Sequence, residues 1–231
     1  MRLTNYEAIQ AICSNNEKGL AILIDPDKFD NQTANAFLKT IPQKTTHLFV
    51  GGSTVVNGAT EKTIQSLKAF TQLPIFIFPG SYLQLSNRAD AVLFLSLVSG
   101  RNPEYLIGQQ VKAVQKLKDP TLEVIPTGYL LIDGGHESAV SKVTSTTAMP
   151  QSNVTEIVDT AKAAQLMGAL LIYLEAGSGA KYRISDDIIR QVKQEINIPL
   201  LVGGGIKTEQ EKERVYKAGA DIVVMGTAFE K

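Results

Sequence analysis

The chain has 231 residues, of which 44% are hydrophobic and 20% charged, so it has enough apolar material for a large globular domain. Its 23 Lys and Arg residues balance 23 Asp and Glu residues, and this net charge of zero, without a basic arm, argues against a nucleic-acid partner. The single cysteine, Cys13, excludes an internal disulfide and a cysteine metal cluster.

No segment reads as a signal peptide or a membrane span. Residues 1–15 carry scattered polar side chains. The longest nearly pure apolar run, residues 91–98, is far shorter than the roughly 20 residues that a membrane-spanning helix needs. We therefore expect a soluble, cytoplasmic protein.

Short β-rich apolar runs alternate with longer amphipathic segments along the chain. This alternation favours an α/β fold of parallel strands and crossover helices, because such strands are buried on both faces. Eight strands joined in this way predict a (β/α)₈ TIM barrel, formed as a single domain by residues 1–231. The predicted strands cover residues 20–25, 47–50, 74–78, 91–96, 122–125, 170–175, 199–202 and 221–225.

The connections between these strands are uneven. Asn153 with Glu156, and Thr208 with Glu211, have the spacing of a helix-capping residue and its reciprocal partner. Only residues 79–90 join the third strand to the fourth, about the length that a crossover needs before its loops are counted. The third helix should therefore be reduced or missing. The residues given after the eighth strand are likewise too few for an outer helix.

Glycine-containing segments follow the sixth, seventh and eighth predicted strands. The run Gly203-Gly204-Gly205 precedes an amphipathic helix, Gly226 ends the last strand, and Ser178 lies between two glycines after the sixth. Such loops let backbone N–H groups approach an anion, and in barrels they frequently form one phosphate site. The alternative is that these glycines only make tight turns. Neither glycine run extends to a dinucleotide-binding G-x-G-x-x-G motif.

Polar residues also end the first two strands. Asp25 and Ser53 should lie side by side at the barrel mouth, where a carboxylate, a hydroxyl, waters and phosphate oxygens could hold Mg²⁺. The alternative for Asp25 is a turn cap, and Asp27 is expected to point away. His47 is expected to be structural, and His136 to be a loop residue rather than a ligand or acid. A zinc site has no support.

Together these segments resemble the geranylgeranylglyceryl phosphate synthases and their bacterial relatives, the heptaprenylglyceryl phosphate synthases. The resemblance covers nearly the whole chain, although many phosphate-binding barrels share the glycine loops alone. The matching segments are Ile-Asp-Pro-Asp-Lys at 24–28, Val-Gly-Gly-Ser at 50–53, Ile-Phe-Pro-Gly-Ser at 77–81, Ser-Gly-Arg-Asn-Pro at 99–103, Tyr-Leu-Glu-Ala-Gly-Ser-Gly at 173–179, Val-Gly-Gly-Gly-Ile at 202–206 and Met-Gly-Thr at 225–227.

The resemblance implies that the chain joins sn-glycerol 1-phosphate to a long prenyl diphosphate, geranylgeranyl diphosphate, through an ether bond. It implies Mg²⁺ at Asp25 and Ser53. Leu23 stands where other relatives have a lysine, so that contact cannot be transferred. The implied glycerol phosphate contacts are Tyr173, Leu174, Glu175, Ala176, Gly177, Ser178, Gly179, Gly204, Gly205, Gly226 and Thr227.

The chemistry of this reaction assigns further roles. We hypothesise that Glu175 is the base that takes the hydroxyl proton of glycerol phosphate. The relatives form dimers or hexamers, and a lipid product is compatible with transient membrane contact.

Apolar residues near the shortened third connection could line a prenyl pocket, although Phe76 is better explained by barrel packing. The pocket residues considered are Phe76, Phe78, Tyr82, Leu83, Leu85 and Leu95.

Two alternatives stay open at this stage. The first is another phosphate-binding barrel enzyme, such as a sugar-phosphate isomerase or aldolase. Such enzymes usually need a lysine or a carboxylate pair inside the barrel, whereas Lys28, Lys181 and Lys207 all fall in predicted loops. The second is a non-catalytic sensor of a phosphate ligand, which would keep the glycine loops but have no use for Asp25, Ser53 or Glu175.

Overall fold

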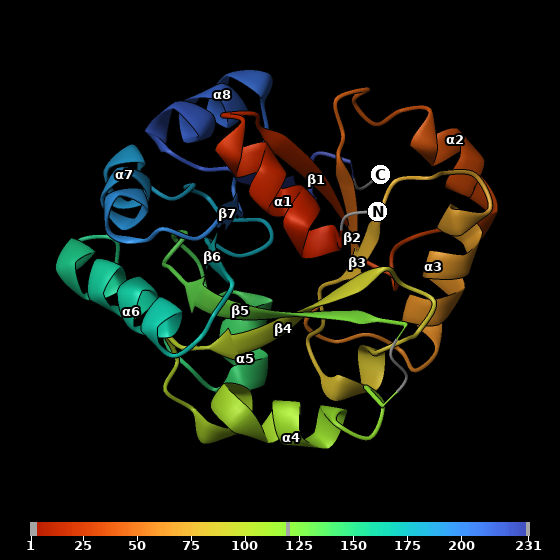
Figure 1. Ribbon diagram of the computed structural model, residues 1–231, viewed down its shortest axis with the longest axis horizontal. Helices are drawn as coiled ribbons and strands as arrows, with labels where there is room; N and C mark the ends of the chain where they lie inside the picture. Colours follow the sequence, from red (N-terminus) through yellow and green to blue (C-terminus); the bar gives the residue numbers. More distant parts are fainter. Residues whose placement is uncertain (1–3, 119–120, 230–231) are drawn as a thin grey trace.

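The computed structural model describes residues 4–118 and 121–229. Eight parallel strands form a closed barrel in chain order, and β1 pairs with β8 to complete the ring (Figure 1). The predicted TIM barrel and its eight strands are confirmed. The strands are β1 (Gly19–Ile24), β2 (His47–Val50), β3 (Ile75–Ile77), β4 (Ala91–Leu97), β5 (Glu123–Leu131), β6 (Leu171–Glu175), β7 (Leu200–Gly203) and β8 (Ile222–Met225).

Most of the helices surround the barrel (Figure 1). Between β3 and β4 there is only the 3₁₀ turn η2 (Tyr82–Gln84), so the prediction of a reduced third helix is confirmed. A π-helical segment, η3 (Glu104–Gly108), leads into α4. The other elements are η1 (Asn31–Thr33), α1 (Asn5–Ser14), α2 (Ala34–Leu38), α3 (Ala59–Lys68), α4 (Gln109–Ala113), α5 (Ala139–Thr144), α6 (Val154–Leu166), α7 (Asp186–Glu195) and α8 (Glu209–Ala218).

The two predicted helix caps have different outcomes. Thr208 and Glu211 form the expected reciprocal capping box at the start of α8. The prediction for α6 is wrong, because the Asn153 side chain accepts no hydrogen bond from the helix backbone. Its amide nitrogen instead donates to the Glu156 carboxylate at 2.5 Å. Asn153 and Glu156 therefore contact each other through their side chains, and the Asn153 side chain does not cap the first turn of α6.

Side chains along each strand alternate between the barrel interior and the layer beneath the outer helices. In β6, Leu171 and Tyr173 belong to the interior cluster, and Ile172 and Leu174 belong to the outer one. Glu175 is the next residue of the inward-facing series, at the carboxyl end of the strand. The barrel geometry therefore directs this carboxylate toward the mouth.

An N-terminal helix that the sequence analysis did not predict covers the opposite end of the barrel. Ile9 of α1 is fully buried in the interior cluster, with Tyr6 packed against it. The Asn5 side chain donates hydrogen bonds to the Asp90 carbonyl and the Glu123 carboxylate, at the start of β4 and β5. Figure 1 shows α1 across the centre of the ring. This arrangement leaves the carboxyl end of the barrel as the open face.

The ends of two other elements bear on the predictions. Strand β5 runs through Pro126 to Leu131, beyond the predicted end at Ile125. A turn follows β8, with Phe229 packed against the outer core, and residues 230 and 231 lie outside the described residues. None of the helices in the described ranges is long and apolar enough to cross a membrane.

Candidate functional site

The loops at the carboxyl end of the barrel enclose a cavity of about 370 Å³, which we call the polar cavity. Most of the predicted site residues meet there. Leu174 and Ala176 do not, because their side chains are in the outer core, and Gly179 lies at the exposed edge of its loop. The predicted residues on the wall are Asp25, Ser53, Tyr173, Glu175, Gly177, Ser178, Gly204, Gly205, Gly226 and Thr227.

One position on the wall of this cavity requires glycine. Gly204 has φ +81°, and a Cβ atom added there would lie 2.4 Å from Oε1 of Glu175 and 2.7 Å from the Ala176 nitrogen. A side chain would therefore collide with both the carboxylate and the adjacent loop. The absence of a side chain lets the loop after β7 nest against the loop after β6.

Several backbone N–H groups around the cavity have no partner. Those of Gly204, Gly205, Gly226 and Thr227 donate no hydrogen bond to any group in the described part of the chain. We call these four N–H groups the amide cluster. Unpaired amides at the ends of adjacent strands, beside the start of α8, form a favourable environment for an anion.

Glu175 is the buried acid of the polar cavity, with 6% of its surface exposed. Its Oε1 accepts the Gly177 N–H at 2.7 Å. Burial raises the pKa of Glu175, while the nearby Tyr173 hydroxyl and the Gly177 N–H act in the opposite direction. The Tyr173 hydroxyl lies beside the carboxylate without an aligned hydrogen bond. The result is a carboxylate with an increased affinity for protons.

Two tyrosine hydroxyls are left unpaired at the base of the cavity. The Tyr129 and Tyr173 hydroxyls are buried and have no partner among the described residues. Burial, and then the charge of Glu175, raises the pKa of both phenols, so they stay protonated and can donate. Their rings meet at 5.5 Å, and Phe78 contacts both. The sequence analysis did not identify Tyr129 as a site residue, although Tyr129 in β5 is the register partner of Tyr173 in β6.

Asp25 lies where the first two strands end. A Cβ atom on Gly52 would be 3.3 Å from Oδ1 of Asp25, so the carboxylate rests against the loop that carries Ser53. The Lys28 ammonium is 3.4 Å from Oδ2. Asp27 is turned away, as expected, and accepts the Val56 N–H at 3.0 Å. The predicted pair of a carboxylate and a hydroxyl therefore exists at the cavity wall.

The donor set at this position suits a hard cation. It consists of one carboxylate and one hydroxyl, and the described residues contain no group of three or more His, Cys, Asp or Glu side chains that could hold a metal. Mg²⁺ commonly binds proteins through one or two carboxylates and takes its other ligands from water and phosphate. The residues present fit that habit and do not fit a structural zinc site.

Three further residues on the wall contribute two positive charges and one apolar side chain to the polar cavity. Lys28 and Lys207, which the sequence placed in loops, both line it, and Leu23 also lines it. None of the eight strands contains a lysine. Among the described residues, the positive charges of the cavity therefore lie in loops at its rim, which is unsuited to a Schiff base inside the barrel.

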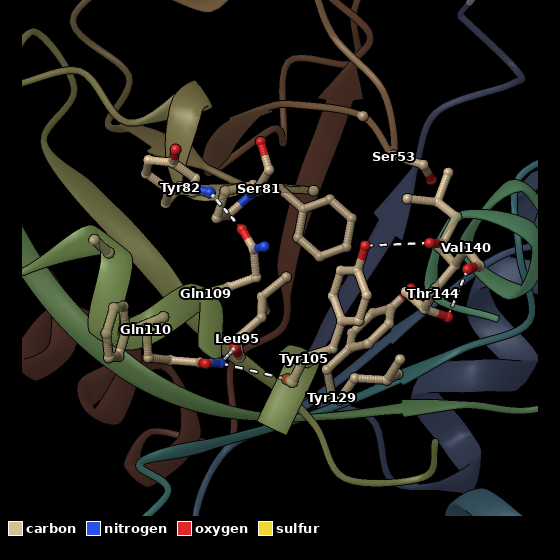
Figure 2. A pocket seen from close by; sticks show the side chains of 18 of the residues that line it. Ser53, Ser81, Tyr82, Leu95, Tyr105, Gln109, Gln110, Tyr129, Val140 and Thr144 are labelled. Atoms are coloured by element: carbon tan, nitrogen blue, oxygen red, sulfur yellow. Dashed lines mark hydrogen bonds between the residues drawn. The ribbon is translucent and has the colours of Figure 1, made fainter. Parts of the chain in front are cut away.

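A second cavity of about 90 Å³, the apolar groove, opens from the first (Figure 2). Phe78, Tyr129 and Val140 line both spaces. Figure 2 shows Gln109 and Gln110 on one side, and Val140 and Thr144 of α5 on the other. The groove thus runs between the α4 side of the barrel and α5.

Polar side chains around the groove are largely satisfied by backbone groups. Gln109 accepts the Tyr82 N–H at 3.0 Å, and the Tyr105 hydroxyl donates to the Val143 carbonyl at 3.1 Å. Gln110 donates to the Leu95 carbonyl. These contacts engage much of the polar surface, so the groove presents mainly hydrocarbon and aromatic rings.

The predicted pocket residues divide clearly. Four of them line the groove, namely Phe78, Tyr82, Leu85 and Leu95. Phe76 is instead fully buried in the barrel and stacks on Phe49 at 5.7 Å, so the packing interpretation is confirmed. Leu83 is 51% exposed and lies outside the groove wall.

The two histidines lie away from the polar cavity wall. His47 is buried between Phe49 and Phe76, and burial lowers its pKa to about 4. Its Nδ1 is 2.7 Å from the Thr46 hydroxyl, which confirms a structural role. His136 contacts the carbonyl of Ser178 rather than the cavity.

Comparisons with known proteins agree over nearly the whole chain. Residues 14–231 match the PcrB family. A geranylgeranylglyceryl phosphate synthase of Zunongwangia profunda is 50% identical over 93% of this chain and 92% of its own length. One of Flavobacterium johnsoniae is 48% identical over 98% and 94% of the two chains.

A solved structure from the same group of enzymes has a closely similar fold. The (S)-3-O-geranylgeranylglyceryl phosphate synthase of Thermoplasma acidophilum, in complex with its substrate sn-glycerol-1-phosphate, superposes with a TM-score of 0.91. It is 36% identical, and the match covers 100% of this chain and 93% of that one.

Proposed function

The chain belongs to the PcrB family, and we propose that it is a Mg²⁺-dependent prenyltransferase of ether-lipid biosynthesis. It joins sn-glycerol 1-phosphate to a long-chain prenyl diphosphate, with geranylgeranyl diphosphate as the donor, and releases diphosphate. The observation that carries this proposal is the junction of two unlike spaces at Phe78 and Tyr129. A small polar substrate fits the polar cavity, and a hydrocarbon chain fits the apolar groove.

The glycerol phosphate is held by backbone groups. The amide cluster donates to the phosphate oxygens, and the partial positive charge at the start of α8 adds to the attraction. With the phosphate fixed at this side, the glycerol hydroxyls face the two unpaired phenols and Glu175. This arrangement replaces a bimolecular encounter with a positioned one.

Glu175 acts as the general base. It accepts the proton of the free primary hydroxyl as that oxygen bonds to C1 of the prenyl group and the bond between C1 and the diphosphate oxygen breaks. The raised pKa of Glu175 supports this role, because a buried carboxylate accepts a proton more readily than an exposed one.

Asp25 and Ser53 would hold Mg²⁺. When bound, the ion would supply positive charge that offsets the charge on the departing diphosphate. Lys28 and Lys207 place further positive charge at the same rim. Removing divalent ions with a chelator should abolish turnover, and Mg²⁺ should restore it; undiminished activity after chelation would contradict this part of the proposal.

The test of the reaction is incubation with sn-glycerol 1-phosphate, Mg²⁺ and radiolabelled geranylgeranyl diphosphate. The proposal predicts an organic-soluble phosphorylated ether. Turnover of sugar phosphates would support an isomerase or aldolase, and ligand binding without any product would support a sensor. A cytoplasmic location, transient membrane contact and a dimeric or hexameric state stay predictions, which fractionation and sedimentation would test.

A further inference from the structure

The loop after β6 (residues 176–182) is held in place by the loop after β5 (residues 133–138). The Gly134 carbonyl accepts the N–H groups of Lys181 at 2.8 Å and Tyr182 at 3.0 Å. The supporting loop contributes no residue to the wall of the polar cavity. It therefore fixes one end of the β6 loop from behind.

A histidine makes the corresponding contact near the middle of the loop. Nε2 of His136 is 3.1 Å from the Ser178 carbonyl oxygen, and because a carbonyl only accepts, Nε2 donates. The other ring nitrogen is buried without a partner among the described residues, so this is the only hydrogen bond that the ring makes with them. Ser178 lines the cavity and His136 does not, so the ring reaches the loop from the opposite side.

The orientation of one peptide group follows from this contact. The described peptide bonds are all trans, and in a planar trans peptide the C=O of Ser178 and the N–H of Gly179 point in opposite directions. Because His136 holds the carbonyl away from the cavity, the Gly179 N–H faces the cavity rim. It donates to no group in the part of the chain that the structure describes.

We propose that His136 is a positioning residue, which orients the Ser178–Gly179 peptide so that the Gly179 N–H donates to the phosphate of the bound substrate. This inference rests on the proposed function. It also explains how Gly179, which lies outside the cavity wall, could contact a phosphate at its rim. The side chain acts through the loop and does not touch the reacting atoms.

The test compares two replacements of the same side chain. His136→Leu fills similar space without a donor, and it should raise both Kd and KM for sn-glycerol 1-phosphate about five- to tenfold, the effect of one lost hydrogen bond. Its kcat and its KM for geranylgeranyl diphosphate should be nearly unchanged. His136→Gln can place an amide N–H near the position of Nε2 and should restore most of the affinity. Titration calorimetry gives Kd without turnover.

A neighbouring residue supplies the control. Glu137 is exposed and its carboxylate lies 3.7 Å from the Lys142 ammonium, so Glu137→Ala should leave both constants unchanged. Equal affinity in the wild type and His136→Leu would overturn the inference, as would a fall in kcat at constant KM. If His136→Leu does not fold, a Gln variant no better than His136→Ala overturns it. Failure of the wild type to bind glycerol phosphate would contradict the proposed function itself.

Discussion

The polar cavity takes its walls mainly from short loops that follow consecutive strands, whereas the apolar groove is enclosed by segments far apart in the chain. Tyr82 and Tyr105 approach it from one part of the barrel, and Val143 from another. In the polar cavity, four backbone N–H groups have no partner among the residues that the structure describes. In the groove, polar side chains are tied to backbone carbonyls and amides. The barrel rim thus offers hydrogen-bond donors on one side and hydrocarbon on the other. A reaction between a polar substrate and a hydrocarbon chain requires both.

The largest effect should come from the base in the polar half. Glu175→Gln keeps an acceptor for the Gly177 N–H but removes the proton acceptor, so kcat should fall by about 10²–10⁴-fold. The Kd for glycerol phosphate should change little, because the phosphate contacts remain. Steady-state kinetics with calorimetry would check both values. A variant with full activity would remove Glu175 from the mechanism.

The backbone of the polar half can be tested at Gly204. The backbone of Gly204 is left-handed, and a methyl group added there would collide with the Glu175 carboxylate. Gly204→Ala should therefore weaken glycerol phosphate binding by about 10–100-fold, which corresponds to strain of about 1–3 kcal/mol. Gly168→Ala is the matched control, since φ is +102° but nothing lies within 4 Å of the added atom. It should lower Tm without changing Kd. Equal losses of affinity in both variants would refute a local role for Gly204.

A substitution in the apolar groove should affect the prenyl substrate and leave glycerol phosphate binding unchanged. Leu95→Asn places a polar group on the apolar wall and should raise KM for geranylgeranyl diphosphate by about tenfold, since burying a leucine contributes about 1.5–3 kcal/mol. The Kd for glycerol phosphate should stay near the wild-type value. Leu83→Asn, at an exposed position outside the groove, should behave as wild type. Loss of affinity for both substrates in the Leu95 variant would mean that the two halves are not separable.

The smallest expected effect concerns stability. Because burial raises the folded-state pKa of Glu175, its neutral form favours folding at low pH, and this contribution is lost as pH rises through the folded pKa. Glu175→Gln should therefore have a higher Tm than the wild type at neutral pH, by a few degrees for each kcal/mol. The difference should disappear in acid, where both side chains are neutral. Thermal melts across pH would show it, and a lower Tm for the variant at pH 7 would contradict the sign.

The same contrast explains how far the sequence could predict this molecule. The strands and the polar site were accessible because apolar runs mark buried strands, and residues at the carboxyl ends of parallel strands converge on one face. Glu175 ends β6 and Gly204 directly follows β7, so their meeting required no knowledge of distant packing.

The remaining features depend on tertiary contacts. Tyr129 belongs to the interior core of the barrel, and it differs from its apolar neighbours there by a buried hydroxyl with no hydrogen-bond partner among the described residues. Tyr105 and Val143 meet across the groove although 38 residues separate them. Helix α1 has an ordinary capping box, but nothing in its sequence indicates which end of the barrel Ile9 will enter. The contact from His136 to a backbone carbonyl carries no sequence signature at all.

The most direct test of the account is a crystal structure with sn-glycerol 1-phosphate and a non-hydrolysable thio analogue of geranylgeranyl diphosphate bound together. We expect the phosphate within hydrogen-bonding distance of the amide cluster and the prenyl chain along Phe78 and Leu95. The free primary hydroxyl should lie between Glu175 and C1 of the prenyl group. A phosphate bound away from Gly204 and Gly226, or a prenyl chain outside the groove, would contradict the division of the rim into two halves.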